Sequence, residues 1–590
     1  MFIAHVRKKD GKRQLLKDHL KESARLSEDF GRKIGLGKTC YLTGLIHDLG
    51  KYSNAFQQYL VKAVANSASV KRGSIDHSTA GGKLIYDICH KENKDPVSLI
   101  LAELIGNAII SHHSSQGLQD FITPVGEAKS VYLNRVEKKE IEEYDEIKKR
   151  FFREVLPENR FLDEIELAKD ELRTLFFPFE KVNSETMFYI LKFIYSCLLD
   201  ADRTDTMLFE ENRSYEFHSN KKLLEVYSQR LEEKIHSFKS DTPINQLRKE
   251  MSDQCKAFSQ KKTGIYTLSI PTGGGKTLAS LRFGLNHAIK HERERIIYVV
   301  PFTTIIEQNA TTAREILRDE ENILEHYSNV FKEQEKEVES SYEQEDSEYK
   351  QALLKDNWEA PVIFTTMVQF LNTIYSKGTR NPRRFHNLIN AVIIFDEVQG
   401  IPINCIYLFN ECLNFLKKYG NTTSVLCTAT QPSLEHVGLK LLKDVDGEMI
   451  TNLIEVESGF KRVEIMDKTK VETWSLEELA NFGQNILKEK KSLLIILNTK
   501  SAVRKLYQYF TKELLIDVTV YHLSTSMCGR HRKIILDEIR KKLENKEPIL
   551  CITTQLIEAG VDISFQSVIR SIAGNWVDVG NFYENTTNSV

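Results

Sequence analysis

The segment from Gly264 to Leu278 combines the residue types that bind phosphate. Its sequence, GIYTLSIPTGGGKTL, is a short apolar strand that leads through Thr272 into three glycines, a lysine and a threonine: Gly273, Gly274, Gly275, Lys276 and Thr277. Consecutive glycines let the backbone turn tightly enough for several N–H groups to converge on phosphate oxygens at the start of the next helix. The lysine would reach the β- and γ-phosphates, and the threonine hydroxyl would coordinate Mg²⁺. We therefore predict an ATP site here.

This phosphate motif departs from its usual pattern at one position and has acidic partners downstream. The pattern G-x-x-x-x-G-K-[ST] requires glycine where this chain has Ile270, so a turn that only joins strand to helix is the alternative. The apolar run NAVIIFDEVQG ends on Asp396 and Glu397. At the end of a buried strand, Asp396 could share the Mg²⁺ and Glu397 could orient and deprotonate the attacking water. Gln246, about one helix before the glycines, could read the adenine edge.

A second group of chemically capable residues lies in the first third of the chain, where histidines and aspartates interrupt apolar helical patterns. Imidazole nitrogen and carboxylate oxygen suit Mn, Fe, Co or Ni, and a carboxylate beside a histidine can bridge two ions. A single such histidine is more often a satisfied core residue, and histidines that only cap or fill helices are the alternative. A whole series of them favours a metal centre: His19, His47, Asp48, His77, His112, His113 and Asp202.

The spacing of apolar residues indicates the elements that position both groups. From Gln14 to about Thr206, apolar residues recur every three or four positions, which predicts helices. Strand and helix patterns alternate after about Ser240 and again from about Thr469. We therefore expect a multidomain protein with an all-α domain and two α/β domains, divided as 1–215, a linker helix in 216–242, 243–460 and 461–590.

Composition limits the partners and the compartment. The 590 residues are too many for a single core, and 81 basic against 83 acidic residues exclude a globally basic nucleic-acid-binding protein. Nine cysteines without a C-x-x-C pair favour a reducing compartment over disulfides or a thiolate zinc site, so we expect a cytoplasmic protein. The N-terminal MFIAHVRKKDGK has no apolar core after its charges, and no run of about 18 apolar residues is present, so the sequence indicates neither secretion nor a membrane span.

The histidine-rich segments resemble a known family. HDLGK, from His47 to Lys51, resembles the signature of the HD-domain phosphohydrolases, and the order His, His-Asp, His, His-His, Asp is similar to their two-metal form. The resemblance implies one ion on His19, His47, Asp48 and Asp202, and a second ion on Asp48, His77, His112 and His113. Two ions about 3.5–4 Å apart would bind the scissile phosphate and generate hydroxide, with Lys51 close to the phosphate.

The segments TGGGKT, DEVQ and TAT, in that order, resemble the first RecA-like domain of superfamily-2 helicases. Joined behind an HD domain, they look like the CRISPR-associated helicase–nuclease of type I interference systems. The resemblance implies a monomer, recruited by a crRNA-guided surveillance complex, that unwinds invading DNA and degrades its single strands. Its cofactors would be two transition-metal ions in the HD domain, and ATP with Mg²⁺ in the helicase. The alternatives are an HD phosphohydrolase acting on nucleotides or RNA, and a non-catalytic, ATP-dependent recruitment module with a decayed motor.

The second α/β unit departs from that family. TTQLIEAGVDI, from Thr553 to Ile563, resembles a helicase motif that contacts the nucleic-acid backbone and the nucleotide. After SVIRSIAG the family's Q-x-x-G-R-x-x-R helix is missing, so we expect an incomplete second RecA-like domain and slow ATP hydrolysis. Two basic groups could track a DNA strand: Arg380, Arg383 and Arg384 in the first unit, and Arg530, Arg532 and Lys533 in the second.

Overall fold

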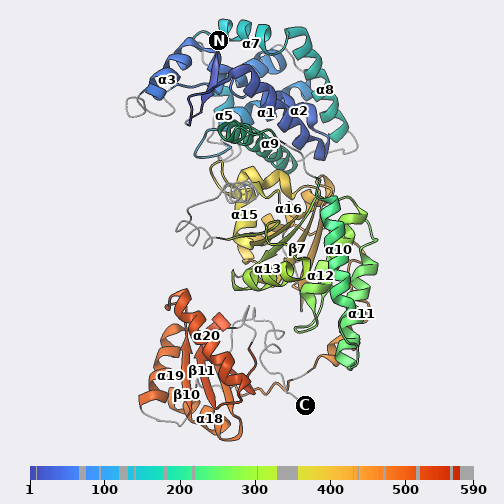
Figure 1. Ribbon diagram of the computed structural model, residues 1–590, viewed down its shortest axis with the longest axis vertical. Coiled ribbons are helices and arrows are strands. Elements are labelled where there is room, and N and C mark those ends of the chain that lie inside the picture. Colours follow the sequence, from blue (N-terminus) through green and yellow to red (C-terminus); the bar gives the residue numbers. More distant parts are fainter. Residues whose placement is uncertain are drawn as a thin grey trace.

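The structure of the protein is a computed structural model. It describes residues 1–590 apart from Lys8, Phe302, Thr430, Ser433, Arg462 and the segments 66–74, 92–94, 119–129, 138–140, 177–183, 216–218, 328–356, 435–437, 470–473, 513–517, 558–562 and 572–590. The side chains of Ala65, Ser184, Thr303 and Thr304 are also not described. A helical domain lies at one end of the molecule, a six-stranded sheet in the middle and a four-stranded sheet at the other end (Figure 1).

The N-terminal region is helical, as its apolar spacing predicts. Its helices are α1 (Leu16–Gly31), α2 (Gly37–Ile46), α3 (Asn54–Ala65), α4 (Thr79–Tyr86), α5 (Pro96–Ser111), α6 (Val131–Val136), α7 (Tyr144–Glu154), α8 (Glu158–Phe176) and α9 (Ser184–Glu211), with short helical turns η1 (Arg32–Ile34), η2 (Leu49–Tyr52) and η4 (Asp87–Lys91). A small antiparallel pair, β1 (Ile3–Val6) and β2 (Arg13–Leu15), precedes them. Helix α9 packs against α1, α2 and α5, so it forms the centre of this domain.

The middle unit is a parallel sheet in the order β3-β8-β7-β4-β6-β5. Its strands are β3 (Ile265–Ser269), β4 (Arg295–Val300), β5 (Ile323–His326), β6 (Val362–Thr366), β7 (Ala391–Asp396) and β8 (Thr423–Thr428). Nearly all strand residues are buried, as expected for a parallel sheet covered on both faces.

Alternate strand residues belong to two different cores. Ile296 and Ile394 pack with α10 (Lys221–His236), α11 (Pro243–Phe258), α12 (Lys276–Lys290) and α13 (Thr303–Leu317). Ile297 and Phe395 pack with α15 (Met367–Tyr375), α16 (Ile406–Lys418) and η6 (Pro382–Leu388). Helix α10, which the sequence pattern places in a linker, thus contributes to a core of the middle unit.

The second of these cores continues into the helical domain. One hydrophobic cluster runs from α1, α2 and α9 through η6 and α16 to the inner strands of the sheet. Helix α9 lies against η6 and α16, between the helical domain and the sheet (Figure 1). The two units therefore share a packed interface, and α9 belongs to both.

The last unit has a parallel sheet in the order β10-β11-β9-β12. Its strands are β9 (Ser492–Ile496), β10 (Thr519–Leu523), β11 (Ile549–Thr553) and β12 (Ser567–Arg570), and its helices are α18 (Leu476–Glu489), α19 (Lys500–Lys512) and α20 (Gly529–Glu544). The short α17 (Leu453–Gly459) precedes it. Among the described residues, no helix is both long and apolar enough to cross a membrane. The fold class predicted from the sequence, a helical domain followed by two α/β units, is confirmed.

Candidate metal centre and nucleotide site

Five segments of the helical domain converge on one point. His19 lies in α1, His47 and Asp48 follow α2, His77 precedes α4, His112 and His113 follow α5, and Asp202 lies within α9. Their ligand-type atoms form two groups, and within each group these atoms lie within 4.8 Å of one another. The first ligand cluster is His19, His47, Asp48 and Asp202, and the second ligand cluster is Asp48, His77, His112 and His113. These are the two groupings that the resemblance implies.

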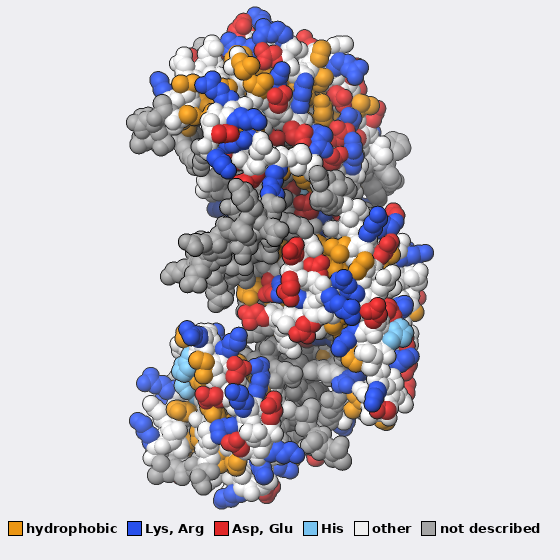
Figure 2. Space-filling model, in the orientation of Figure 1, with side chains coloured by type: hydrophobic (Ala, Val, Ile, Leu, Met, Phe, Trp, Pro, Cys, Tyr) orange, Lys and Arg blue, Asp and Glu red, His pale blue; other side chains and the backbone are white. Residues whose placement is uncertain are grey.

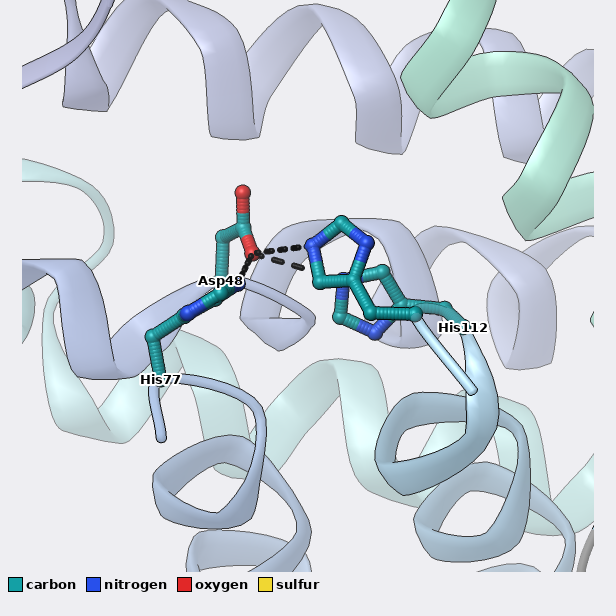
Figure 3. Close-up of side chains that lie close together, drawn as sticks. Asp48, His77 and His112 are labelled. Atoms are coloured by element: carbon teal, nitrogen blue, oxygen red, sulfur yellow. Dashed lines mark ion pairs between the residues drawn. The ribbon is translucent and has the colours of Figure 1, made fainter. Parts of the chain in front are cut away.

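Asp48 belongs to both clusters because its two carboxylate oxygens face different histidines. Oδ2 lies 3.4 Å from Nε2 of both His19 and His47. Oδ1 lies 3.5 Å from Nε2 of His77 and 3.4 Å from Nε2 of His112, which reach it from different segments (Figure 3). Asp48 is therefore placed as a carboxylate that can bridge two cation positions.

The donor set fits divalent transition-metal ions, because its histidines present a free nitrogen to Asp48. Nδ1 of His47 lies 2.8 Å from the carbonyl oxygen of Gly44, and Nδ1 of His112 lies 2.6 Å from that of Ile109. A carbonyl only accepts, so Nδ1 carries a hydrogen, and Nε2 is the nitrogen whose lone pair a metal ion would take when the ring is neutral. Within the two ligand clusters, the buried Nε2 atoms without a hydrogen bond are those of His19, His47, His77 and His112. Such orphaned polar atoms are rare, and a metal ion would satisfy them.

The electrostatics of the two clusters favour a cation. Burial opposes protonation of His47, but Asp48 and Asp202 outweigh it and raise its pKa to about 10. Burial also disfavours the ionised form of Asp48, yet Lys51 and His47 hold the pKa of this carboxyl well below its usual range. Burial lowers the pKa of His77 to about 4, so this ring is neutral. At neutral pH the ring of His47 therefore carries a proton that a metal ion would displace, whereas the carboxylate of Asp48 is already ionised, as metal binding requires.

Lys51 lies beside the centre and contacts its bridging residue. Its Nζ is 2.6 Å from Oδ2 of Asp48, and its side chain is 6% exposed. His113 lies at the open side of the second ligand cluster, with 51% of its side chain exposed and its Nε2 4.0 Å from Oδ1 of Asp48. The centre is therefore accessible to solvent on the His113 side.

Asp205 is a site residue whose role the sequence did not reveal. Its Oδ2 accepts from Nδ1 of His19 at 2.6 Å and from Nε2 of Gln14 at 2.8 Å. Asp202, three residues earlier, faces the same ring from the other side, with Oδ1 3.5 Å from Nε2 of His19. Asp205 thus orients the ring without joining the cluster. The spacing of three residues, which puts both aspartates on one helical face, was the available signal.

The loop before α12 has the backbone conformation that phosphate binding needs. Gly273 and Gly275 have φ values of 73° and 85°, in the left-handed region that favours glycine. A Cβ atom on Gly274 would lie 2.6 Å from Cγ2 of Ile270 and 2.8 Å from the carbonyl oxygen of Pro271. Ile270, which replaces the first glycine of the motif, is part of the core under the loop, and its side chain fills the space beside Gly274, so this position has room only for glycine.

Lys276 begins α12 and lies between the two carboxylates that follow the central strand β7. Its Nζ is 3.0 Å from Oδ1 of Asp396 and also donates to Glu397. Burial opposes the charge of Lys276, but Asp396 and Glu397 outweigh it and raise its pKa above the usual value. Thr277 donates from Oγ1 to Oδ1 of Asn309 at 3.3 Å. These groups meet at the carboxyl ends of parallel strands, where α/β sheets bind nucleotides.

Helix α11 reaches the loop through Arg248, which the sequence did not single out. Nε of Arg248 donates to the carbonyl oxygen of Gly273 at 2.8 Å. Gln246 is exposed and donates to the carbonyl oxygen of Ser240 at 3.3 Å, so its contact with adenine stays a prediction. Thr272 lies half-buried in the loop.

The prediction that Arg383 and Arg384 track a DNA strand is wrong. Arg383 is 5% exposed and donates to Oδ1 of Asp200 at 2.5 Å, where η6 meets α9. Arg384 is 1% exposed and lies over the ring of Trp358. The sequence suggests two exposed charges here because it shows no nearby acidic partner. The partner of Arg383, Asp200, lies 183 residues earlier in the chain.

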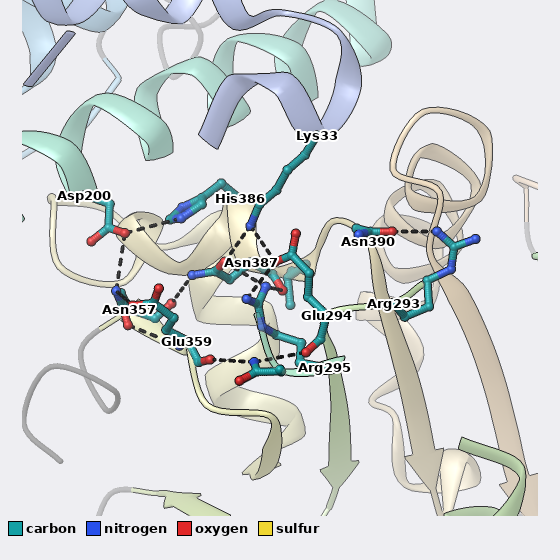
Figure 4. Close-up of polar contacts among 12 residues, drawn as sticks. Lys33, Asp200, Arg293, Glu294, Arg295, Asn357, Glu359, His386, Asn387 and Asn390 are labelled. Atoms are coloured by element: carbon teal, nitrogen blue, oxygen red, sulfur yellow. Dashed lines mark hydrogen bonds and ion pairs between the residues drawn. The ribbon is translucent and has the colours of Figure 1, made fainter. Parts of the chain in front are cut away.

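A polar network joins the helical domain to the sheet at this contact (Figure 4). Lys33 lies 3.0 Å from Glu294 and donates to Oδ1 of Asn387 at 2.9 Å. His386 lies 3.3 Å from Asp200 through Nε2. The contact therefore combines a half-buried ion pair and buried polar contacts with the shared hydrophobic cluster.

The remaining basic candidates lie on the surface. Arg380, Arg530 and Lys533 are exposed and Arg532 is half-buried, the last three at the start of α20. On the face shown in Figure 2, Lys and Arg side chains alternate with Asp and Glu over the described residues. This mixed pattern agrees with the balanced composition. Of the TAT and TTQLIEAGVDI segments, Thr430, Gly560 and Asp562 lie outside the described residues.

Family models match three separate parts of the chain. The HD domain of Cas3 matches residues 7–171, the DEAD/DEAH box helicase matches residues 251–437, and the C-terminal part of the CRISPR-associated nuclease/helicase Cas3 matches residues 489–576. The first model covers the segments that carry the ligand histidines, and the second covers the glycine loop, Asp396 and Glu397.

Curated relatives at low sequence identity are also described as Cas3 nuclease/helicases. A protein of Methanocaldococcus jannaschii assigned to the Cas3 nuclease/helicases is 24% identical over 67% of this chain and 54% of its own length. The CRISPR-associated nuclease/helicase Cas3 of Methanothermobacter thermautotrophicus is 24% identical over 97% of this chain and 71% of its own length. The chain therefore spans about half the length of the first relative and more of the second.

Solved structures share the fold. The crystal structure of T. fusca Cas3-ATP has a TM-score of 0.60 at 15% identity, covering 97% of this chain and 71% of that one. A chain of a CRISPR RNA-guided surveillance complex, pre-nicking, has a TM-score of 0.54 at 13% identity, covering 99% of this chain and 71% of that one. At these identities the likeness concerns the fold alone.

Proposed function

Because this chain belongs to the Cas3 family of CRISPR-associated nuclease/helicases, we propose that it cuts single-stranded DNA in its helical domain and translocates on DNA with its ATP-binding sheet. The placement of Asp48 between two histidine clusters carries the nuclease part of this proposal. A phosphodiesterase of this kind needs two adjacent cation positions joined by one carboxylate, and the ligand clusters supply the residue types for both.

The residues of the helical domain would hold two divalent ions, of Mn, Fe, Co or Ni. When bound, these ions would supply Lewis-acid activation of water and of the scissile phosphate. His19, His47 and Asp202 would hold one ion, and His77, His112 and His113 the other, with Asp48 shared. Lys51 brings a fixed positive charge beside Asp48, where it would attract a phosphodiester.

The sheet would bind ATP with Mg²⁺ at the glycine loop. Lys276 would exchange its contacts with Asp396 and Glu397 for the β- and γ-phosphates, which frees both carboxylates. Asp396 and Thr277 would then hold Mg²⁺, and Glu397 would orient and deprotonate water. Gln246 is the proposed contact with adenine.

The substrate and partners follow from the family. The proposed substrate is foreign single-stranded DNA in antiviral defence, delivered by a crRNA-guided surveillance complex, and the chain would act as a monomer in the cytoplasm. One structural neighbour belongs to a complex described as a CRISPR RNA-guided surveillance complex, pre-nicking, which supports such a partner. The boundaries 1–215, 216–242, 243–460 and 461–590 remain the proposed division into HD domain, linker helix and two RecA-like domains, with the linker helix packed on the first RecA-like domain.

The test is digestion of circular single-stranded DNA by the purified chain with Mn²⁺, Co²⁺ or Ni²⁺. We expect cutting with at least one of these ions and none after chelation with EDTA, because the ligand atoms belong to histidines and carboxylates. Circular DNA has no ends, so its loss demonstrates endonuclease action. Hydrolysis of nucleotides or RNA with the same ions, while DNA stays intact, would favour a phosphohydrolase of another kind and contradict the proposal.

A further inference from the structure

The side chain of Arg135, on α6, ties together two segments of the metal centre. Its Nη2 donates to Oδ1 and Oδ2 of Asp76, each at 3.1 Å, to Oγ of Ser78 at 3.1 Å and to Oγ1 of Thr79 at 2.7 Å. Its Nη1 donates to the carbonyl oxygen of Ile110 at 2.7 Å. One guanidinium therefore spans the start of α4 and the end of α5, with 24% of its side chain exposed.

These contacts lie next to the residues of the second ligand cluster. Asp76 immediately precedes His77, and Ile110 lies two residues before His112. The carbonyl oxygen of Ile109, in the same helical turn, accepts from Nδ1 of His112 at 2.6 Å. The position of the α4 start relative to the α5 end determines how far apart His77 and His112 lie, and Arg135 bonds to both ends.

The first ligand cluster has a separate support. Asp205 accepts from Nδ1 of His19 at 2.6 Å, and Gln14 donates to the same carboxylate at 2.8 Å. His47 is oriented by the carbonyl oxygen of Gly44 at 2.8 Å. The hydrogen bonds of Arg135 described above all go to residues of α4, of α5 and of the turn before α4, and they include none of the first cluster's ligands.

We propose that Arg135 is a positioning residue for the second ligand cluster alone, and that Asp205 has the matching role for the first. The inference rests on the proposed two-metal function and adds a consequence to it. Because the two clusters share only Asp48, each ion would be held by its own outer contacts. One ion could therefore be weakened while the other keeps its affinity.

The test is Mn²⁺ binding to the full chain carrying Arg135→Lys. Lysine keeps the charge but cannot span Asp76, Thr79 and the carbonyl of Ile110 with one fork. We expect two ions per chain in the unchanged protein, and a loss of about 10- to 100-fold in the affinity of one of them in the variant. The electron paramagnetic resonance spectrum should change from that of a magnetically coupled pair to that of isolated ions. Arg153→Lys, at an arginine of α7 with 71% of its side chain exposed, is the matched control.

Double variants identify which ion is affected. With His77→Ala, which removes a ligand of the second cluster, adding Arg135→Lys should change the affinity of the remaining ion less than about twofold, whereas adding Asp205→Asn should weaken it by about 10-fold or more. A folded Arg135→Lys chain that binds both ions with unchanged affinity overturns the inference, as does equal weakening of both. If the unchanged protein binds no Mn²⁺, the proposed two-metal function fails first, and the two failures are distinguishable.

Discussion

Asp200 and Asp202 lie two residues apart on α9 and face opposite partners. Oδ1 of Asp202 is 3.5 Å from Nε2 of His19 in the first ligand cluster, whereas Oδ1 of Asp200 is 2.5 Å from Nε of Arg383 below the helical domain. Two residues turn a helix by about 200°, so a single turn of α9 contributes to the metal centre on one side and to the domain contact on the other. The contact with the six-stranded sheet unit therefore begins within one turn of a candidate ligand.

Replacing Arg383 with alanine should strongly destabilise this contact. Asp200 is 1% exposed, and its burial disfavours the ionised form. The charge of Arg383 outweighs this effect and holds the pKa of Asp200 below its usual range. Removing the arginine leaves the buried carboxylate of Asp200 with longer contacts, among them those to His386 and Asn357. We therefore expect a loss of about 3–5 kcal/mol in the free energy of unfolding. Urea titration followed by circular dichroism measures it.

Arg25→Ala is the control for that measurement. Arg25 also pairs with carboxylates, Glu22 and Asp29, but 46% of its side chain is exposed. Its loss should cost at most about 1 kcal/mol. If Arg383→Ala destabilised the chain no more than Arg25→Ala, the Asp200 pair would not contribute to the domain contact as described.

Lys276→Ala should abolish ATP binding without affecting DNA cutting. The lysine lies between Asp396 and Glu397 at the sheet, and the ligand clusters lie in the helical domain. A fluorescent ATP analogue measures binding, and circular single-stranded DNA with Mn²⁺ measures cutting. Lys290→Ala, at the far end of α12, controls for changes to that helix. Loss of both activities in a folded Lys276→Ala chain would refute two separable sites.

His287 should make the middle unit less stable in acid. Its ring is fully buried, with Nδ1 3.0 Å from the carbonyl oxygen of Ser259 and Nε2 2.7 Å from Oγ1 of Thr423. Burial, with the nearby His291, lowers its pKa to about 3. The unfolded chain, with an ordinary histidine pKa of about 6.5, then binds more protons than the folded chain between these values. The stability that His287 contributes is complete above pH 6.5 and is lost as the pH falls toward 3.

Between pH 7.5 and 5.5 this single group should lower the free energy of unfolding by about 1.4 kcal/mol. Urea titrations of the wild-type chain and of His287→Gln at both pH values test it. Glutamine can donate and accept hydrogen bonds but does not titrate in this range. The free energy of unfolding of His287→Gln should therefore change by about 1.4 kcal/mol less between the two pH values than that of the wild-type chain. Equal pH dependence in the two chains would show that His287 does not carry the effect.

Much of the candidate site could be predicted from the sequence, because its residues fall in short motifs. The glycine loop with Lys276 is local chemistry that the sequence displays directly. The candidate ligands are spread over five segments, and their resemblance to the HD-domain family suggested that they meet. The clusters around Asp48 have the grouping that this resemblance implied. Their roles as metal ligands stay predictions, which the binding experiments test.

The contacts between distant segments could not be predicted. Nothing near Arg383 in the sequence shows that a buried acid from α9 neutralises it. Asp205 is one of three aspartates within six residues, with Asp200 and Asp202, and its role depends on the packing of α9 against His19 of α1. Arg135 is one of many charged residues in its segment, and its partners lie on two other helices. In each case the structural role of a charged residue depends on a partner far away in the sequence.

The most direct test of the account is the cutting of circular single-stranded DNA by Asp48→Asn, measured with Mn²⁺ beside ATP binding on the same preparation. Asp48 is the residue common to both ligand clusters, and asparagine keeps its shape while removing the bridging charge. We expect cutting to fall by more than about 100-fold, beyond the usual cost of losing an outer contact, and ATP affinity to stay unchanged. Asp163→Asn, at an exposed aspartate of α8, should cut like the wild type. Cutting by Asp48→Asn at the wild-type rate would contradict the two-metal centre.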